Sequence, residues 1–190
     1  MKHLIIYAHP NEGSLNNHFK QTVIRCLKET NQEFEVRDLN LIRFDPVLSL
    51  EDMDRQRLGQ VSPEVKKEQD FISRADQIIF IYPIWWTGMP AIMKGYIDRV
   101  MSYGFAYRYD QGVQKGLLSG KQTVIINSHG KSYSEYESIG MNQALSLTSD
   151  KGIFTYCGLE VKKHFFFDKA DKATVDQVSE WTDQLKAIFS

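Results

Sequence analysis

Apolar residues in this chain form short continuous runs that alternate with stretches of helical periodicity. Continuous runs are typical of strands that are buried on both faces of a parallel sheet, and here they occupy residues 4–8, 77–82 and 122–127. Residues 34–39 alternate between apolar and polar side chains, which predicts a strand nearer the sheet edge. A fifth strand is expected within residues 153–161.

Helical spacing of apolar residues separates these strands. Ser14 stands where it would cap the first helix, and Pro63 and Pro90 stand where two later helices would begin. The predicted helices cover residues 15–29, 63–72, 90–101, 141–147 and 175–188. Residues 40–61 are longer than an ordinary connection, so we expect this segment to cover a site or to contact a partner.

Strands that alternate with helices predict a parallel sheet covered on both faces by right-handed crossovers. Five such strands indicate an α/β fold, a flavodoxin-like three-layer sandwich with strand order 2-1-3-4-5. The six-stranded dinucleotide-binding fold is the competing topology, but neither G-x-G-x-x-G nor a phosphate-loop lysine motif is present. A length of 190 residues fits one domain, expected to span residues 1–190.

Charge and cysteine content narrow the classes of partner. The chain carries 23 Lys and Arg against 24 Asp and Glu, so no global field attracts nucleic acid or an anionic membrane. Cys26 and Cys157 form neither a disulfide framework nor a cysteine-rich zinc site, and no metal is expected. The apolar run near the N-terminus is too short for a signal peptide or a membrane span. We therefore expect a soluble cytoplasmic protein.

Ligands of such sheets bind beyond the carboxyl ends of the strands, which makes the loops after the first, third and fourth strands the candidates. Residues 9–17 lead into a helix N-terminus, whose free N–H groups favour phosphate. His9 and Ser14 would complete a phosphate cradle, or would only bond neighbouring backbone and cap the helix.

The second loop places Trp85 and Trp86 between two prolines. Adjacent residues of an extended loop point in opposite directions, so at most one indole is expected to enter the core. The other would wall a site for a planar ligand, with a dimer interface as the alternative.

The third loop, residues 127–133, is small and polar, and Tyr133 and Tyr136 add hydroxyl groups. A phosphate cradle, a planar wall and a polar edge together describe a site for flavin mononucleotide better than a site for an adenylate.

Several stretches match a known pattern: Ala8-His9-Pro10, Ser14-Leu15-Asn16, Phe44-Asp45-Pro46, Tyr82 to Val100, Gly104 to Tyr107, and Tyr156 to Leu159. With these stretches the sequence resembles the flavodoxin-like NAD(P)H:quinone oxidoreductases, whose bacterial members have about this length. The similarity runs from the first strand to the fifth and is most specific in the central block.

The resemblance implies a homodimer that binds flavin in a cleft shared between subunits. NAD(P)H would reduce the flavin and a quinone would reoxidise it, in a ping-pong exchange. FMN is expected; larger relatives use FAD, but this chain ends near Ser190 without their C-terminal extension.

The resemblance also assigns site residues by motif position. The cofactor would contact His9, Ser14, Leu15, Asn16, Asn17, Pro83, Ile84, Trp85, Trp86, Thr87, Asn127, Ser128, His129 and Gly130. The substrate would contact Trp86, Phe105 and Tyr107, the last two facing the flavin of the partner subunit.

The proton donor is less well defined by the resemblance. The family commonly has a Thr-Thr-Gly-Gly turn where this chain has Asn127-Ser128-His129-Gly130, and its catalytic tyrosine–histidine pair is not cleanly reproduced. Tyr133 or Tyr136 is expected to take the tyrosine role, and His129 is the possible substitute for the histidine. His3, His18 and His164 have no acidic partner at ligand spacing, so structural or surface roles are expected for them.

The leading hypothesis is an FMN-dependent NAD(P)H dehydrogenase that reduces quinones. A flavodoxin-like electron carrier is one alternative, although such carriers are usually strongly acidic and this chain has a net charge of −1. A regulatory flavoprotein, such as the ancillary subunit of a potassium efflux system, is the other.

Overall fold

The computed structural model describes residues 1–189 and contains a parallel sheet in the order β2-β1-β3-β6-β7. Its strands are β1 (Lys2–Tyr7), β2 (Glu33–Asp38), β3 (Gln77–Pro83), β6 (Gln122–Ser128) and β7 (Glu160–Phe167). Renumbered along the sheet, this order is the predicted 2-1-3-4-5, so the flavodoxin-like fold is confirmed. The alternating strand β2 lies at an edge, as its pattern predicted.

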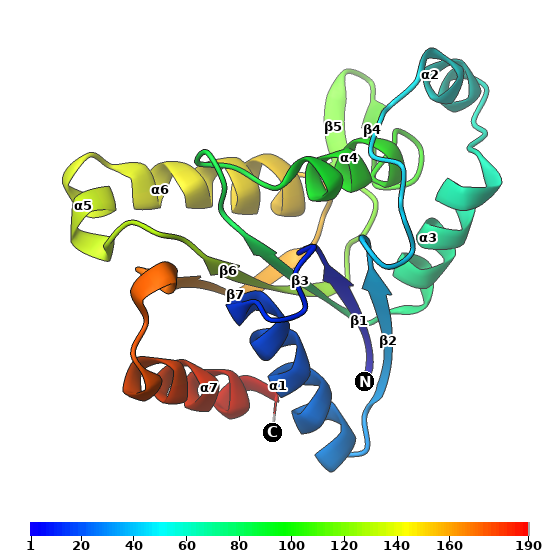
Figure 1. Ribbon diagram of the computed structural model, residues 1–190. Coiled ribbons are helices and arrows are strands. Elements are labelled where there is room, and N and C mark those ends of the chain that lie inside the picture. The colour runs from blue at the N-terminus through cyan, green and yellow to red at the C-terminus, as the bar shows by residue number, and fades with distance from the viewer. Residues whose placement is uncertain (190) are drawn as a thin grey trace.

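Helices cover both faces of the sheet (Figure 1). On one face lie α1 (Leu15–Glu29) and α7 (Val175–Phe189); on the other lie α3 (Pro63–Arg74), α4 (Ala91–Val100) and α6 (Met141–Ser146). Each face has its own buried apolar cluster, because side chains of the buried strands point alternately to the two sides. None of the helices within residues 1–189 has the length and apolar character needed to cross a membrane.

The prediction for the fifth strand was wrong at its start. Helix α6 continues as a π-helix, η1 (Leu147–Thr155), so Ile153 is helical, and the strand runs from Glu160 to Phe167. Gly158, at φ 91°, turns the chain between the two elements.

The aromatic residues 165–167 form the end of strand β7. Phe165 and Phe167 are buried in the cluster beneath α7, where the Phe167 ring centroid lies 5.1 Å from that of Trp181. Phe166 points to the opposite face, because neighbours on a strand alternate.

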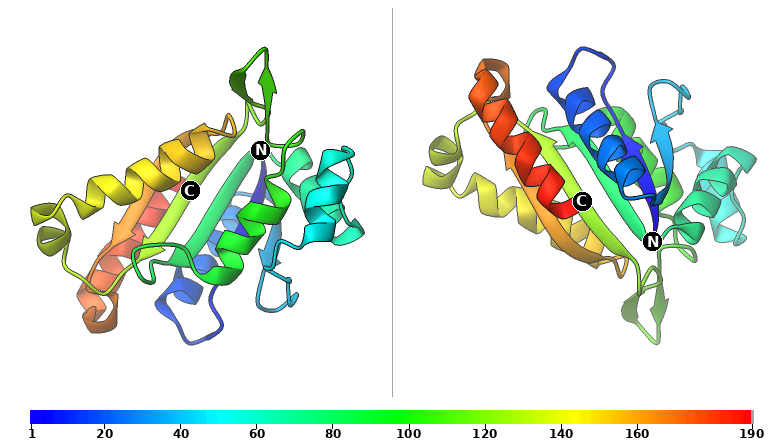
Figure 2. Two further views of the ribbon diagram at one scale, coloured as in Figure 1. Left: turned by 90° about the horizontal axis from the view of Figure 1, so that it is seen from above. Right: turned by 90° about the horizontal axis from the view of Figure 1, so that it is seen from below.

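Four further elements were not predicted: α2 (Leu50–Arg57), α5 (Tyr133–Ser138), the 3₁₀ turn η2 (Ala170–Lys172), and a hairpin of β4 (Tyr107–Asp110) and β5 (Val113–Gly116). Figure 2 shows the hairpin projecting from the body of the molecule. Its loop residues Gln111 and Gly112 both have positive φ, which is the geometry of a tight two-residue hairpin turn.

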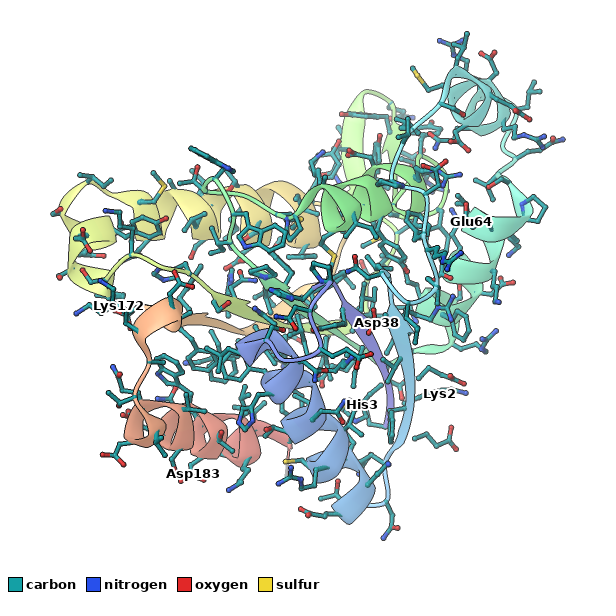
Figure 3. The ribbon with its side chains drawn as sticks, viewed as in Figure 1. Lys2, His3, Asp38, Glu64, Lys172 and Asp183 are labelled. Carbon is teal, nitrogen blue, oxygen red and sulfur yellow. The ribbon has the colours of Figure 1, made fainter. Side chains whose placement is uncertain are left out.

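The long segment after β2 is tied to α4 by the buried guanidinium of Arg99. Its Nε donates to the Asp52 carboxylate at 3.1 Å, and its Nη1 donates to the Asp45 carbonyl at 2.6 Å and to Glu64 at 2.9 Å. Glu64 lies on α3 (Figure 3), so one cation joins the segment to two helices. Gly95 permits this packing, because a Cβ there would lie 2.1 Å from the Pro46 carbonyl oxygen.

We predict that Gly95→Ala lowers the free energy of unfolding by about 1–3 kcal/mol, since the added methyl would clash with backbone. Urea denaturation measures this loss. Gly152→Ala is the matched control, because a Cβ there makes only an ordinary contact at 3.5 Å with the Leu147 carbonyl oxygen. Equal stability of wild type and Gly95→Ala would contradict the tight contact between α4 and the long segment.

Candidate active site

The loops after β1, β3 and β6 meet at the carboxyl edge of the sheet. Backbone and side-chain hydrogen bonds join the ends of these strands. The Ala8 N–H donates to the Ile81 carbonyl at 3.0 Å, and the Ile84 N–H donates to the Ser128 carbonyl at 2.8 Å. Asn16 Nδ2 also donates to Ser128 Oγ at 2.8 Å. The loops after β1, β3 and β6 therefore form one connected surface.

A cavity of about 310 Å³, here called the Ser14 cavity, lies among these loops. Of the predicted cofactor residues it brings together His9, Ser14, Leu15, Asn16, Pro83, Ile84, Trp85, Ser128, His129 and Gly130. Ala170 and Asp171, from η2, also line it and were not predicted. They reach the cavity because Gly130 has no side chain: a Cβ there would lie 2.9 Å from Asp171 Oδ2.

The N-terminus of α1 forms one wall of the Ser14 cavity. Ser14 caps the helix, its Oγ accepting from the Asn17 N–H at 3.2 Å, and His9 Nδ1 accepts from the Asn11 N–H at 3.1 Å. Both residues thus make the local contacts considered from the sequence, and both also line the cavity. Burial lowers the pKa of His9, so its ring is neutral at neutral pH, and the N-terminus of the 15-residue helix contributes positive potential to this wall.

Two residues that line the same cavity have buried polar atoms without hydrogen-bond partners. Asn16 Oδ1 and both ring nitrogens of His129 have no hydrogen-bond partner, and each residue is 3% exposed. An unsatisfied buried polar group costs about 1–3 kcal/mol, so a ligand or water that bonded these atoms would be favoured here. Burial also lowers the pKa of His129, and a neutral imidazole supplies one donor and one acceptor.

The two candidate tyrosines differ in their surroundings. The Tyr136 ring stacks on the His129 ring with a centroid distance of 4.9 Å. Tyr133 is 56% exposed and lines a separate hollow beside Glu137 and Phe166. The structure therefore brings Tyr136, and not Tyr133, to the histidine.

The loop after β3 closes in a strained turn. Trp85 and Gly88 exchange two backbone hydrogen bonds of 3.0 Å, and between them Trp86 and Thr87 both have positive φ, at 51° and 57°. Turns of this kind usually hold Asn and Gly, and a β-branched residue there is a true outlier. Strain of this sort persists at functional sites, where surrounding structure holds it in place.

Neither tryptophan enters the core. Trp85 is 45% exposed and contacts the His9 ring edge to face at 5.6 Å, while Trp86 is 100% exposed. The tight turn points both indoles outward, leaving Trp86 available to a ligand or a second subunit.

A second cavity of about 250 Å³, here called the His164 cavity, lies between this turn and η1. Thr87 and Gly88 line it on the turn side, and Asn127 and His164 line it on the sheet side. Asn127 thus lines the His164 cavity, whereas Ser128, His129 and Gly130, which follow it in the chain, line the Ser14 cavity. Ile84 lines both cavities.

The expectation that His164 lacks an acidic partner was wrong. Its Nδ1 lies 2.8 Å from Asp150 Oδ1, and its Nε2 lies 2.7 Å from Asn127 Oδ1. Asp150 stands on η1, so only the packing of the π-helix against β7 creates the pair.

Besides Trp86, Tyr133 and Tyr136, three more predicted residues lie outside both cavities of the single chain. Asn17 is occupied locally, its Nδ2 donating to the Glu12 carbonyl. Phe105 lines another hollow, beside Ser102 and Tyr103. Tyr107 packs edge to face against Tyr103, Tyr109 and Tyr156 at the start of the hairpin.

Comparison with known proteins accounts for this architecture. Residues 1–188 match a family described by its flavodoxin-like fold. A Haemophilus influenzae protein named as an uncharacterized NAD(P)H oxidoreductase is 37% identical, over 96% of this chain and 94% of its own length. The chain belongs to the flavodoxin-like NAD(P)H:quinone oxidoreductase family.

Two further relatives are a longer enzyme and a protein of nearly the same length as this oxidoreductase. Rat NAD(P)H dehydrogenase [quinone] 1 is 30% identical over 83% of this chain, which spans 65% of the rat enzyme's length. The crystal structure of Smu.1420 from Streptococcus mutans superposes with a TM-score of 0.88 at 34% identity, over 100% of this chain and 98% of that one.

We predict that Thr87→Gly raises the free energy of unfolding of this oxidoreductase by about 0.5–1 kcal/mol, because glycine relieves the positive φ. Chemical denaturation measures the change. The same substitution at Thr155, an exposed helical threonine, is the control and lowers stability by about 0.5 kcal/mol. Destabilisation by Thr87→Gly similar to that of the control would show that the turn is not strained.

Proposed function

We propose that this protein is a homodimeric, FMN-dependent NAD(P)H:quinone oxidoreductase that acts in the cytoplasm, with residues 1–190 forming one flavin-binding domain. One observation carries the proposal: Asn16 and His129, which both line the cavity at the N-terminus of α1, have buried polar side-chain atoms without a hydrogen-bond partner. Membership of the oxidoreductase family and the quinone-reducing rat relative support the reaction type.

The residues present fit FMN. The first-turn N–H groups of α1, with Ser14, His9 and Asn17, would hold the phosphate, since a helix N-terminus favours an anion. Asn16 would offer its free oxygen to a ribityl hydroxyl. Ser128, His129 and Gly130 would face the pyrimidine edge, and the backbone from Ile84 to Thr87, with Pro83, Leu15 and the Trp85 ring, would flank the isoalloxazine. When bound, FMN supplies hydride acceptance from NAD(P)H and hydride donation to a quinone.

His129 and Tyr136 are the groups that the chain offers for charge and proton control. A neutral His129 can donate one N–H toward an oxygen that gains negative charge, in a site where burial strengthens that bond. The stacked Tyr136 ring fixes the imidazole plane and places a hydroxyl nearby. Tyr133 is the weaker candidate, because it lines a separate hollow, whereas Tyr136 stacks on His129.

Exposed apolar side chains support a homodimer. The long segment carries Leu41, Ile42, Val47, Leu48, Leu50, Met53 and Leu58, each at least 37% exposed. Exposed apolar side chains gathered on one segment are typical of an interaction surface. In the dimer, Phe105 and Tyr107 of the partner subunit would cover the substrate side of the flavin, consistent with their position outside both cavities of their own chain.

The visible spectrum of the purified protein tests the proposal, followed by anaerobic addition of NADPH and then of menadione. Flavin bands that bleach and return are expected, and chromatography of the released flavin distinguishes FMN from FAD. Flavin that neither NADH nor NADPH reduces would favour an electron carrier. A protein that binds no added flavin would overturn the proposal, and low turnover with a co-purifying membrane protein would favour the regulatory role.

We predict that Trp86→Ala lowers kcat/KM for menadione roughly tenfold while the dissociation constant of FMN stays within about twofold, because the indole is exposed and only backbone would contact flavin. Steady-state kinetics and flavin fluorescence titration give the two numbers. Trp85→Ala is the comparison and should weaken FMN binding, since Trp85 lines the Ser14 cavity. An equal loss of FMN affinity in both variants would exclude a substrate-side role for Trp86.

A further inference from the structure

His164 occupies the sheet side of the His164 cavity and is bonded at both ring nitrogens. Its side chain is 6% exposed, and that of its partner Asp150 is 17% exposed. The Phe166 ring stacks on the imidazole with a centroid distance of 3.9 Å. A histidine held on three sides in this way has a fixed orientation.

The orientation of Asn127 determines which His164 nitrogen carries a proton. Asn127 Nδ2 donates to the Tyr82 carbonyl at 2.9 Å, and a carbonyl only accepts. The amide oxygen therefore faces His164 Nε2 at 2.7 Å, and that nitrogen must donate. The reversed amide would set two oxygens against each other.

The second ring nitrogen faces a carboxylate. Nδ1 lies 2.8 Å from Asp150 Oδ1, an oxygen that also lies 2.8 Å from the Ser149 hydroxyl. A hydrogen bond between Nδ1 and Asp150 needs a proton in addition to the one on Nε2. An imidazolium that faces a carboxylate would satisfy both contacts of the ring.

We propose that His164, protonated on both ring nitrogens and bonded to Asp150, is a positioning residue that fixes the flavin-binding loops through Asn127. The inference rests on the proposed function and adds to it a residue that acts outside the Ser14 cavity. It names His164 Nε2–H as the donor that keeps the Asn127 amide turned toward Tyr82.

The path from His164 to the loops is short. Tyr82, whose carbonyl Asn127 holds, immediately precedes the turn after β3. Ser128, which follows Asn127, accepts from the Ile84 N–H and from Asn16 Nδ2. If Nε2 lost its proton, two lone pairs would face each other, the Asn127 amide would turn, and the contacts between the ends of β3 and β6 would loosen.

Other ionisable groups near the pair come from three elements. Asp150 lies on η1. Lys94 on α4 lines the same cavity, with its Nζ 2.6 Å from Asp98. Tyr82 on β3 also lines it, and burial raises its pKa, so its hydroxyl is neutral at neutral pH.

The variant Asp150→Asn tests whether His164 can hold Asn127 in place without a charge on its own ring. An asparagine amide can donate to an unprotonated Nδ1, leaving Nε2–H in place for Asn127, so the loop geometry should persist with a neutral imidazole. His164→Ala removes both bonds. His18→Ala is the matched control, because this exposed histidine bonds only the Thr182 hydroxyl through its ring, across α1 and α7.

The first measurement is nitrogen-15 NMR of labelled histidines in the protein as purified at pH 7, with His164 assigned from the signals lost in His164→Ala. Two protonated ring nitrogens are expected for wild type, and a neutral ring with only Nε2 protonated for Asp150→Asn. An unprotonated Nδ1 in wild type would overturn the proposal.

The second measurement is the dissociation constant of FMN at pH 7, followed by flavin fluorescence. We expect His164→Ala to weaken binding at least tenfold, Asp150→Asn to stay within threefold of wild type at pH 7, and His18→Ala to match wild type.

The outcomes distinguish failure of the proposed function from failure of the positioning role of His164. Wild-type protein that binds no FMN overturns the proposed function, while the NMR result still reports on His164. Wild-type protein that binds FMN with an affinity unchanged in His164→Ala overturns the positioning role alone. A loss in Asp150→Asn as large as that in His164→Ala would also overturn it, because position would then not survive removal of the charge.

Discussion

The site depends on the register between β3 and β6, in which Tyr82 lies opposite Asn127 and Pro83 lies opposite Ser128. The parallel pairing continues through Pro83, because in a parallel ladder the Ser128 carbonyl accepts from the next residue along β3, the Ile84 N–H, at 2.8 Å. That bond brings the tryptophan turn against the loop after β6. Asn16 then joins both to α1 through the Ser128 hydroxyl.

Two features that lower the stability of the fold lie close to these contacts between the loops. The turn at Trp86 and Thr87 holds non-glycine residues at positive φ, and Asn16 and His129 bury polar atoms without partners. Neither would persist without two well-packed cores on the faces of the sheet. A ligand that bonds the free polar atoms would offset one of these costs, which is why they support cofactor binding better than the cavity volume does.

Sequence patterns predicted the sheet order and the Ser14 cavity because both depend on local signals. Buried strands have continuous apolar runs, and the loops that follow them are short enough to place most of the predicted cofactor residues together. The hairpin was missed although Asp110-Gln111-Gly112-Val113 carries a glycine at its turn. Ala170 and Asp171 had no such signal, because they reach the cavity only where Gly130 leaves room.

The misplaced fifth strand and the missed role of His164 have one physical cause. Residues 147–155 form a π-helix, a form that is rare, carries no simple apolar period and often marks functional sites. Its apolar residues Ile153 and Phe154 pack toward the sheet, so in sequence they read like the start of a strand. The same winding carries Asp150 to His164, fourteen positions away on β7. Since the contact exists only once η1 has packed on β7, no spacing rule could have revealed it, and the acidic partner of the histidine is a property of the fold.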